Sequence, residues 1–237
     1  IKARVPGTVR LVADGAAAEQ KGIWVLRDGN FHVEGIAFEG ARVPHANGAG
    51  IRFERGSLSL SQCRFAGNEM GILTGNEPNT TLVIERCEFE GRRQGAQFGH
   101  NVYVGRIANV KVSGSSFHTA FRGHLLKSRA RVSEVLDCRL IDGPHGQASY
   151  ELEFPDGGDV LVRGCTIGQE ATTQNTAMVS YGVEGYPHAY NRFQMIDTTL
   201  ENRASSGVFV RIAPGPVETV LRNNRFRGPG ELQGVRT

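Results

Sequence analysis

An eight-residue pattern that recurs along the whole chain is the feature that most limits its fold. The pattern reads apolar, any, apolar, any, any, small, any, large apolar, and eight copies fall within 237 residues. The copies are FHVEGIAF (31–38), LSLSQCRF (58–65), LVIERCEF (82–89), VKVSGSSF (110–117), SEVLDCRL (133–140), VLVRGCTI (160–167), FQMIDTTL (193–200) and TVLRNNRF (219–226). Consecutive copies end 23 to 33 positions apart. Repeats of this length indicate a solenoid, in which each repeat forms one coil and stacks on its neighbours.

The spacing of apolar residues inside each copy selects strands over helices. Apolar residues alternate in steps of two, whereas a helical repeat needs a period of 3.6 residues, and the leucine-rich repeat frame is absent. A second alternating segment precedes each copy, and these segments are GIWVL (22–26), GIRFE (50–54), GILT (71–74), NVYVG (101–105), LLKSR (125–129), YELEF (150–154), AMVSY (177–181) and VFVRI (208–212). We therefore expect an all-β chain, a single-domain right-handed parallel β-helix of about eight coils over residues 1–237. A further coil or a capping helix is expected before Ile1, because an open end exposes strand edges.

With these repeats the chain resembles the bacterial right-handed parallel β-helix proteins of the pectin-lyase-like superfamily. The resemblance covers nearly the whole chain. It implies a role linked to polysaccharides and a secreted, periplasmic or cell-surface location. The Trp-x-Asp-His and Arg-x-Pro-x-x-Arg motifs of pectate lyases are missing. No catalytic residue is therefore transferred by motif, and the fold alone does not specify an activity.

Charge and hydropathy exclude two classes of partner. Lys and Arg number 27 against 24 Asp and Glu, and they are scattered along the chain, which argues against nucleic acid. No apolar run approaches the roughly 18 residues of a membrane span. Nothing in the sequence predicts the oligomeric state.

All four cysteines occupy the sixth position of the repeat. Cys63 and Cys87 fall in consecutive copies, as do Cys138 and Cys165, so each pair should be stacked in neighbouring coils. Disulfides or a metal site are one interpretation. The favoured one is an internal ladder of small side chains, since free cysteine packs as a small hydrophobe and neighbouring parallel strands rarely suit a disulfide.

The segment LLKSR places two cations within a predicted strand. Lys127 and Arg129 must face outward, because an unpaired buried charge is costly. Leu126 and Ser128 then face the core, and Leu125 lies outside.

The same alternation orients the neighbouring segments. The residues expected to face outward are Asn101, Tyr103, Glu151, Glu153, Tyr181 and Arg211, and those expected to face inward are Val102, Val104, Tyr150, Leu152 and Phe154. His100 and His124 precede two strands and are placed to lean over the same surface. Coils stack about 4.8 Å apart, so acidic, basic and aromatic groups should meet on one face.

This face is the predicted functional site, and its residues suit chemistry on an acidic sugar. Lysine or arginine acts as a base or neutralises a uronate carboxylate, tyrosine stacks on a ring or donates a proton, and two glutamates hold Ca²⁺ or serve as a hydrolase acid–base pair. The predicted catalytic residues are Lys127, Arg129, Glu151, Glu153, Tyr103 and His124. The predicted substrate-binding residues are Asn101, His100, Tyr181 and Arg211. The predicted metal ligands are Glu151 and Glu153, with calcium as the cofactor.

A purely structural interpretation of the same residues is also open. Lys127 with Glu151, and Arg129 with Glu153, would form exposed cross-strand ion pairs worth about 0.2–1 kcal/mol each. His100 and His124 would then form hydrogen bonds within the turns that precede the strands. The long interval 168–192 and the stretch 92–101 are expected to form walls beside the site.

The predicted function is therefore a carbohydrate-active β-helix protein that binds, and as a lyase or hydrolase cleaves, an acidic polysaccharide or oligosaccharide. The alternative is a non-catalytic glycan-binding or structural module of a larger surface or secreted protein.

Overall fold

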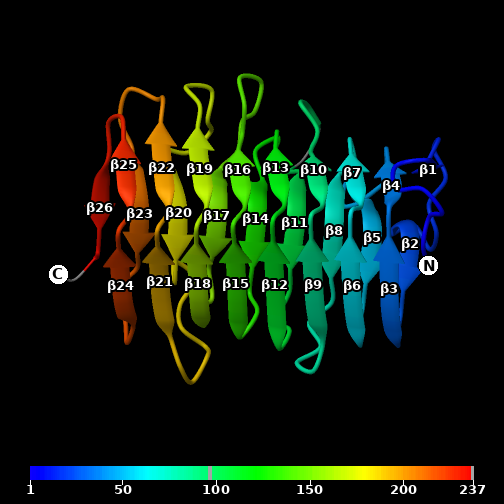
Figure 1. Ribbon diagram of the computed structural model, residues 1–237, viewed down its shortest axis with the longest axis horizontal. Helices are drawn as coiled ribbons and strands as arrows, with labels where there is room; N and C mark the ends of the chain where they lie inside the picture. Colours follow the sequence, from blue (N-terminus) through cyan, green and yellow to red (C-terminus); the bar gives the residue numbers. More distant parts are fainter. Residues whose placement is uncertain (96–97, 236–237) are drawn as a thin grey trace.

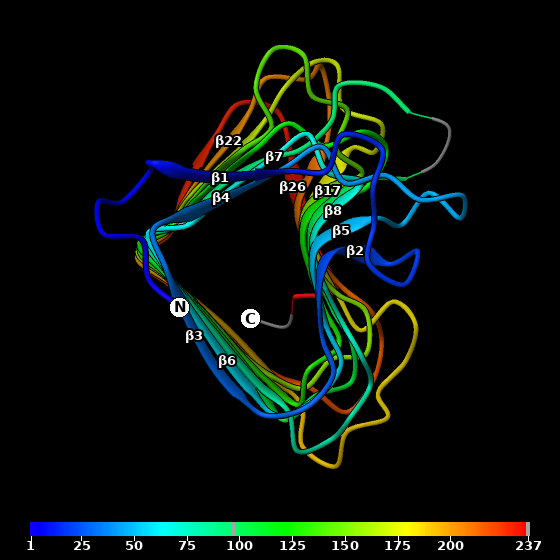
Figure 2. The same cartoon turned by 90° about the vertical axis from the view of Figure 1, so that its right-hand side faces the viewer.

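Each repeat forms one coil of a parallel β-helix in the computed structural model, which describes residues 1–95 and 98–235 (Figure 1). Three parallel sheets run along the stack, and the end-on view in Figure 2 shows them as the three sides of a triangular section. The described residues contain no helix, and therefore none long and apolar enough to cross a membrane. The all-β solenoid of about eight coils is confirmed.

The strands belong to the sheets in strict rotation. Sheet I contains β1 (Val9–Val12), β4 (Ile36–Glu39), β7 (Arg64–Ala66), β10 (Glu88–Glu90), β13 (Ser116–His118), β16 (Arg139–Ile141), β19 (Thr166–Gln169), β22 (Thr199–Asn202) and β25 (Arg225–Arg227). Sheet II contains β2 (Gly22–Leu26), β5 (Ala49–Phe53), β8 (Met70–Thr74), β11 (His100–Val104), β14 (His124–Ser128), β17 (Tyr150–Phe154), β20 (Ala177–Tyr181), β23 (Val208–Ile212) and β26 (Glu231–Gln233). Sheet III contains β3 (Asn30–Glu34), β6 (Ser57–Ser61), β9 (Thr81–Glu85), β12 (Asn109–Ser113), β15 (Val132–Leu136), β18 (Asp159–Arg163), β21 (Arg192–Ile196) and β24 (Glu218–Arg222).

The eight-residue pattern is not one strand but two strands joined by a sharp corner. Its first four residues lie in sheet III, its last three or four in or beside sheet I, and its fifth residue turns the chain. That fifth residue has a positive φ in all eight copies, namely Gly35, Gln62, Arg86, Gly114, Asp137, Gly164, Asp197 and Asn223. A left-handed residue at a fixed place in every coil explains why the motif keeps its length while the intervals between copies vary.

Two of these corners carry residues that fit the left-handed conformation poorly. Gln62 and Arg86 have φ values of 52° and 51°. Replacing either by glycine is expected to raise the free energy of unfolding by about 0.5–1 kcal/mol, because the Cβ strain exceeds the entropy that glycine costs. Urea denaturation measures the gain. Gly114→Ala is the control; its added Cβ meets only Cγ of Arg86, at an ordinary van der Waals distance of 3.6 Å, so backbone strain alone should lower stability. Equal stability of all three variants and the wild type would contradict a strained corner.

The core is built from ladders of the same residue position in successive coils. Phe38, Phe65, Phe89 and Phe117 stack with ring centroids 4.7–5.1 Å apart. The cysteine ladder is confirmed as well, because all four thiols are free and buried. The main-chain N–H of Cys63 donates to the Cys87 sulfur at 3.4 Å, so the ladder also satisfies backbone groups at the corner.

Sheet II departs from simple alternation at the second residue of its strands. Between β14 and β17, His124 pairs with Tyr150 and Leu126 with Leu152, so that Leu125 and Glu151 stand outside the register. The same residue is skipped between β2 and β5 and between β20 and β23. Such a skip turns the chain, as a bulge does.

The skipped residue points into the corner between sheets I and II. A Cβ added to Gly50 would lie 2.8 Å from the Phe65 ring, and one added to Gly71 would lie 3.0 Å from Phe89. The second, third and fifth residues of a sheet II strand therefore face the core, and only the first and fourth face outward. Ala49, Met70 and Leu73 show this, since they form a small cluster with Tyr103 that is separate from the core.

Candidate functional site

The outward positions of β11, β14, β17 and β20 gather polar and aromatic side chains on one face of the solenoid. We call them the sheet II cluster, and its members are His100, Tyr103, His124, Lys127, Tyr150, Glu153 and Ser180. Most of them are buried even though they face outward: Glu153 is 4% exposed, His124 8% and Lys127 9%. A cluster of buried titratable groups outside the core is costly for stability, and such clusters are enriched at functional sites.

Four sequence-based orientations are wrong because alternation fails at the sheet II corner. Asn101, Leu125 and Glu151 occupy the skipped second position and are buried inward rather than outward. Asn101 donates a hydrogen bond from Nδ2 to the carbonyl of His118 at 3.1 Å. Tyr150, expected inside, instead lies on the outer face and stacks on His124 with ring centroids 5.3 Å apart.

Tyr181 is a further correction. It was expected outside as a substrate-binding residue, but it is the fifth residue of β20, pairs with Phe154, and is fully buried. Its hydroxyl donates to the carbonyl of Gly158 at 2.7 Å. Tyr103, Lys127 and Glu153 are the fourth residues of their strands and face outward, as expected. The residues that face the core as expected are Val102, Val104, Leu126, Ser128, Leu152 and Phe154.

Glu153 lies at the centre of the cluster. The Lys127 Nζ lies 2.7 Å from Glu153 Oε2, as an ion pair whose angles fall outside those of a hydrogen bond. The His124 Nε2 lies 3.6 Å from the same oxygen. Burial raises the pKa of Glu153, although the Lys127 ammonium partly opposes the rise. Glu153 is thus a more basic carboxylate than usual, held between a cation and an imidazole.

The two histidines are neutral and their protons can be assigned. Burial and Lys127 lower the pKa of His100 to about 3, and burial, His100 and Lys127 lower that of His124 as well. The main-chain N–H of His124 donates to His100 Nδ1 at 2.9 Å, so this nitrogen carries a lone pair. His124 Nδ1, also 2.9 Å from it, must then carry the proton. The His124 Nε2 that faces Glu153 is consequently unprotonated.

Arg129, which follows β14, is the second centre of charge. Its Nε donates to the Tyr103 hydroxyl at 3.0 Å, its Nη1 to buried Asp156, and its Nη2 to both carboxylate oxygens of Glu184 at 2.9 and 2.8 Å. Arg106 also donates to Asp156, at 2.7 Å. Lys127 and Arg129 lie 5.5 and 6.0 Å from the centre of the Tyr103 ring, within the range of cation–π attraction.

The expected partners of the two cations are therefore wrong. Lys127 stands opposite Glu153 rather than Glu151, and Arg129 binds Asp156 and Glu184 rather than Glu153. The cause is again the corner, because it removes Glu151 from the outer face.

Glu151 and Glu153 consequently lie on opposite sides of β17 and share no surface. The expectation that both hold one Ca²⁺, or both act as a hydrolase pair, loses its geometric basis. Across residues 1–95 and 98–235 no three His, Cys, Asp or Glu side chains converge as a metal site would require.

Besides Glu153 Oε2, two side-chain groups in or beside the cluster have no hydrogen-bond partner within the described part of the chain. Ser180 Oγ is fully buried and pairs in register with Glu153. Both oxygens of Glu151 are also unpartnered in the corner. Burial, and next the Asp142 carboxyl, raise the pKa of Glu151 well above its usual value.

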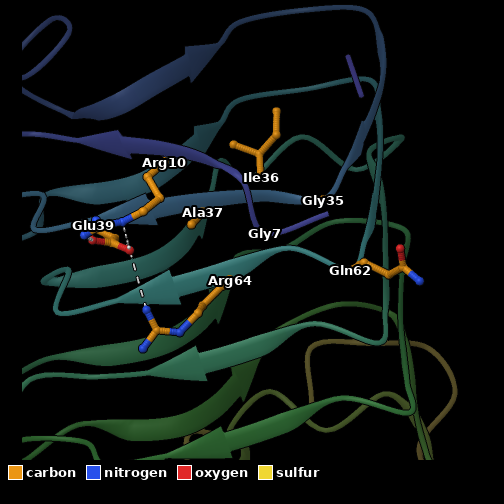
Figure 3. A pocket seen from close by; sticks show the side chains of 8 residues that line it. All are labelled: Gly7, Arg10, Gly35, Ile36, Ala37, Glu39, Gln62 and Arg64. Carbon is orange, nitrogen blue, oxygen red and sulfur yellow. Dashed lines mark hydrogen bonds and ion pairs between the residues drawn. The ribbon is translucent and has the colours of Figure 1, made fainter. Parts of the chain in front are cut away.

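Two hollows of the surface lie away from the sheet II cluster. Arg211, predicted to bind substrate, faces outward beside a polar hollow of about 500 Å³ that also involves Gln233 and Glu231. Another hollow, about 260 Å³, lies on sheet I over Arg10, Glu39 and Arg64, whose ion pairs Figure 3 shows. The sheet II cluster lines neither of these two hollows.

Sequence reasoning missed several members of the network. Tyr150 and Ser180 were missed because alternation assigned Tyr150 inward and gave Ser180 no charge to argue from. Asp156 lies in the turn PDGGD (155–159), and Glu184 in the long interval 168–192 that was expected to form a wall. Part of the other expected wall, residues 96–97 of the stretch 92–101, lies outside the described residues. In Figure 2 the yellow loop between β20 and β21, residues 182–191, projects beside sheet II.

Comparison of the chain with protein-family models, with curated proteins and with solved structures gave no match.

Proposed function

We propose that the sheet II cluster binds an acidic polysaccharide and removes a proton from it, as a lyase does. The observation that carries the proposal is the arrangement around Glu153, where one buried carboxylate of raised pKa contacts both Lys127 Nζ and the unprotonated Nε2 of His124. A base of this kind is useful only if a substrate proton reaches it. The resemblance to the pectin-lyase-like superfamily supports a saccharide as the substrate.

The sheet II cluster and Arg129 together supply the groups that β-elimination from a uronate needs. Arg129 and Lys127 neutralise the sugar carboxylate, which acidifies the proton on the adjacent carbon. Glu153 takes that proton, the bond from the neighbouring carbon to the glycosidic oxygen breaks, and a carbon–carbon double bond forms. The Tyr103 hydroxyl, which accepts a hydrogen bond from Arg129, has its own proton free for the leaving oxygen. Glu153 then loses its proton to solvent and Tyr103 regains one from solvent.

An activity and binding panel tests the proposal. Polygalacturonate, alginate and hyaluronan, with dextran as the neutral control, are incubated with the protein with and without Ca²⁺. The expected result is binding of uronate polymers and a rise in unsaturated uronate absorbance and reducing ends. Glu153→Gln should bind with unchanged affinity and lose turnover at least a hundredfold, because it keeps the shape and removes the base. Turnover by Glu153→Gln equal to that of the wild type would show that Glu153 is not the base.

The pH dependence gives a further check on the base. Because burial raises the pKa of Glu153, the acid limb of turnover should lie above the ordinary glutamate value of about 4.3. An acid limb at or below that value would contradict a buried base.

A non-catalytic glycan-binding or structural module is the second candidate. One observation favours it: three cations (Lys127, Arg129 and Arg106) and three carboxylates (Glu153, Asp156 and Glu184) form one connected network of ion pairs. Binding without any product from the panel would select this candidate.

A further inference from the structure

The carboxylate of Glu184 lies beside the sheet II cluster, and its side chain is 48% exposed. Both of its oxygens accept from Arg129 Nη2, and one of them lies 3.5 Å from Lys127 Nζ. Burial opposes ionisation of Glu184, but the hydrogen bond and charge of Arg129 and the charge of Lys127 outweigh it and lower its pKa. Glu184 is thus ionised and placed as the carboxylate of an acidic ligand would be.

Of the two carboxylates that Arg129 binds, Glu184 is the exchangeable one. The Asp156 side chain is 1% exposed, and it also neutralises Arg106, whereas the Glu184 side chain is 48% exposed. An ion pair with such an exposed member contributes about 0–1 kcal/mol, so an incoming carboxylate loses little by displacing it. The Arg129 side chain is 13% exposed and cannot leave the cluster as easily.

Displacement needs only the side chain of Glu184 to turn. The backbone around it is anchored, because Gly182 N–H donates to Phe154, Glu184 N–H to Pro155 and Gly185 N–H to Gly182, all at 2.9–3.0 Å. The Tyr186 hydroxyl fixes the next residues through Ala213. Gly182 and Gly185 have φ values of 74° and 110°, which position the intervening residues over Arg129.

We infer that Arg129 and Lys127 form a carboxylate-binding subsite that Glu184 fills in the free protein and that a uronate carboxylate takes by displacing it. The inference rests on the proposed function, since it names the part of the cluster that recognises the acidic sugar. Glu184 is then an internal competitor. It sets the affinity for acidic ligands and keeps the subsite satisfied when no ligand is bound.

Calorimetric titration with oligogalacturonate tests this inference on the wild type and on Glu184→Gln. The amide keeps the shape of the side chain but loses the charge that competes. The variant should bind oligogalacturonate about threefold to fivefold more tightly, the factor that an exposed ion pair is worth. Glu90→Gln is the matched control: Glu90 lies on sheet I, is partly exposed and pairs with Arg64 at 2.8 Å, and its loss should leave the affinity unchanged.

The possible outcomes separate the two proposals. Equal or weaker binding by Glu184→Gln, with clear binding by the wild type, overturns the internal competitor and leaves the function standing. No binding of oligogalacturonate by either protein overturns both. If Glu184→Gln gained affinity for dextran by the same factor, the Glu184 side chain would merely obstruct this face. That result also overturns the carboxylate subsite.

Discussion

Replacing Glu151 with methionine is expected to stabilise the protein at mildly alkaline pH by at least about 2 kcal/mol. The carboxyl lies in the corner between sheets I and II, fully buried, and neither oxygen has a partner in the described structure. An unsatisfied buried polar group costs about 1–3 kcal/mol, and more when it is charged. Methionine fits because the same position holds Leu125 in the preceding coil and Met178 in the following one, both in the core.

The gain should depend on pH in a defined direction. The folded pKa of Glu151 lies above the unfolded one, so its stabilising contribution is complete below about pH 4.3 and is lost as the pH rises toward the folded value. The wild type should therefore lose stability across this interval by up to about 1.4 kcal/mol per pH unit from this group. Burial raises the pKa of Asp142 to about 6, so the Glu151→Met variant should keep a smaller dependence of stability on pH.

Chemical denaturation of wild type, Glu151→Met and Glu151→Gln from acid to alkaline pH measures both effects. The glutamine variant keeps an unpartnered polar group, so it should lose the pH slope but gain less stability than methionine does. Identical pH dependence in wild type and Glu151→Met would mean that Glu151 is ionised in the fold.

The second large effect is expected from Lys127→Met. This change leaves the buried Glu153 carboxylate without its ion-pair partner, and breaking a buried pair in this way costs about 3–5 kcal/mol. The double variant Lys127→Met/Glu153→Gln removes both charges, and it should recover most of the lost stability. Denaturation of the two single variants and the double variant gives the coupling between the charges.

Function should not recover with stability. The double variant lacks both the cation that neutralises a sugar carboxylate and the base, so it should be folded, bind polygalacturonate at least tenfold more weakly than the wild type, and turn nothing over. A double variant that is stable and binds like the wild type would show that the Lys127–Glu153 pair serves the fold alone.

The sequence contains the repeat and the strands but not the corners. The ladder of Phe38, Phe65 and Phe89 follows from the eighth motif position, because identical positions stack in a solenoid. The placement of Glu151 does not follow from alternation, since one skipped residue reverses the face of its neighbours. Consecutive apolar residues in Leu125–Leu126, both buried, were the available hint.

The site could be predicted only in part for the same reason. Tyr103, Lys127 and Glu153 stand at the fourth strand position, beyond the corner, where alternation holds. The contact of Glu184 with Arg129 joins residues 55 positions apart through a segment with no repeat pattern, and only the folded chain brings them together. A carboxylate between Gly182 and Gly185 was visible in the sequence, but its partner was not.

The affinity for polygalacturonate of Arg129→Met, set against that of Arg52→Met, tests the central claim most directly. Arg129 directly follows β14 and Arg52 lies on β5, so both belong to or adjoin sheet II, and both bind a carboxylate side chain. Arg52, however, pairs with Glu54 at 3.1 Å, away from the cluster. In Arg129→Met, Asp156 keeps Arg106 as a partner, and a thermal melt confirms that the variant is folded. We predict that Arg129→Met binds at least tenfold more weakly than the wild type, whereas Arg52→Met binds within twofold of it. Equal affinity of the two variants would contradict a functional site on the middle coils of sheet II.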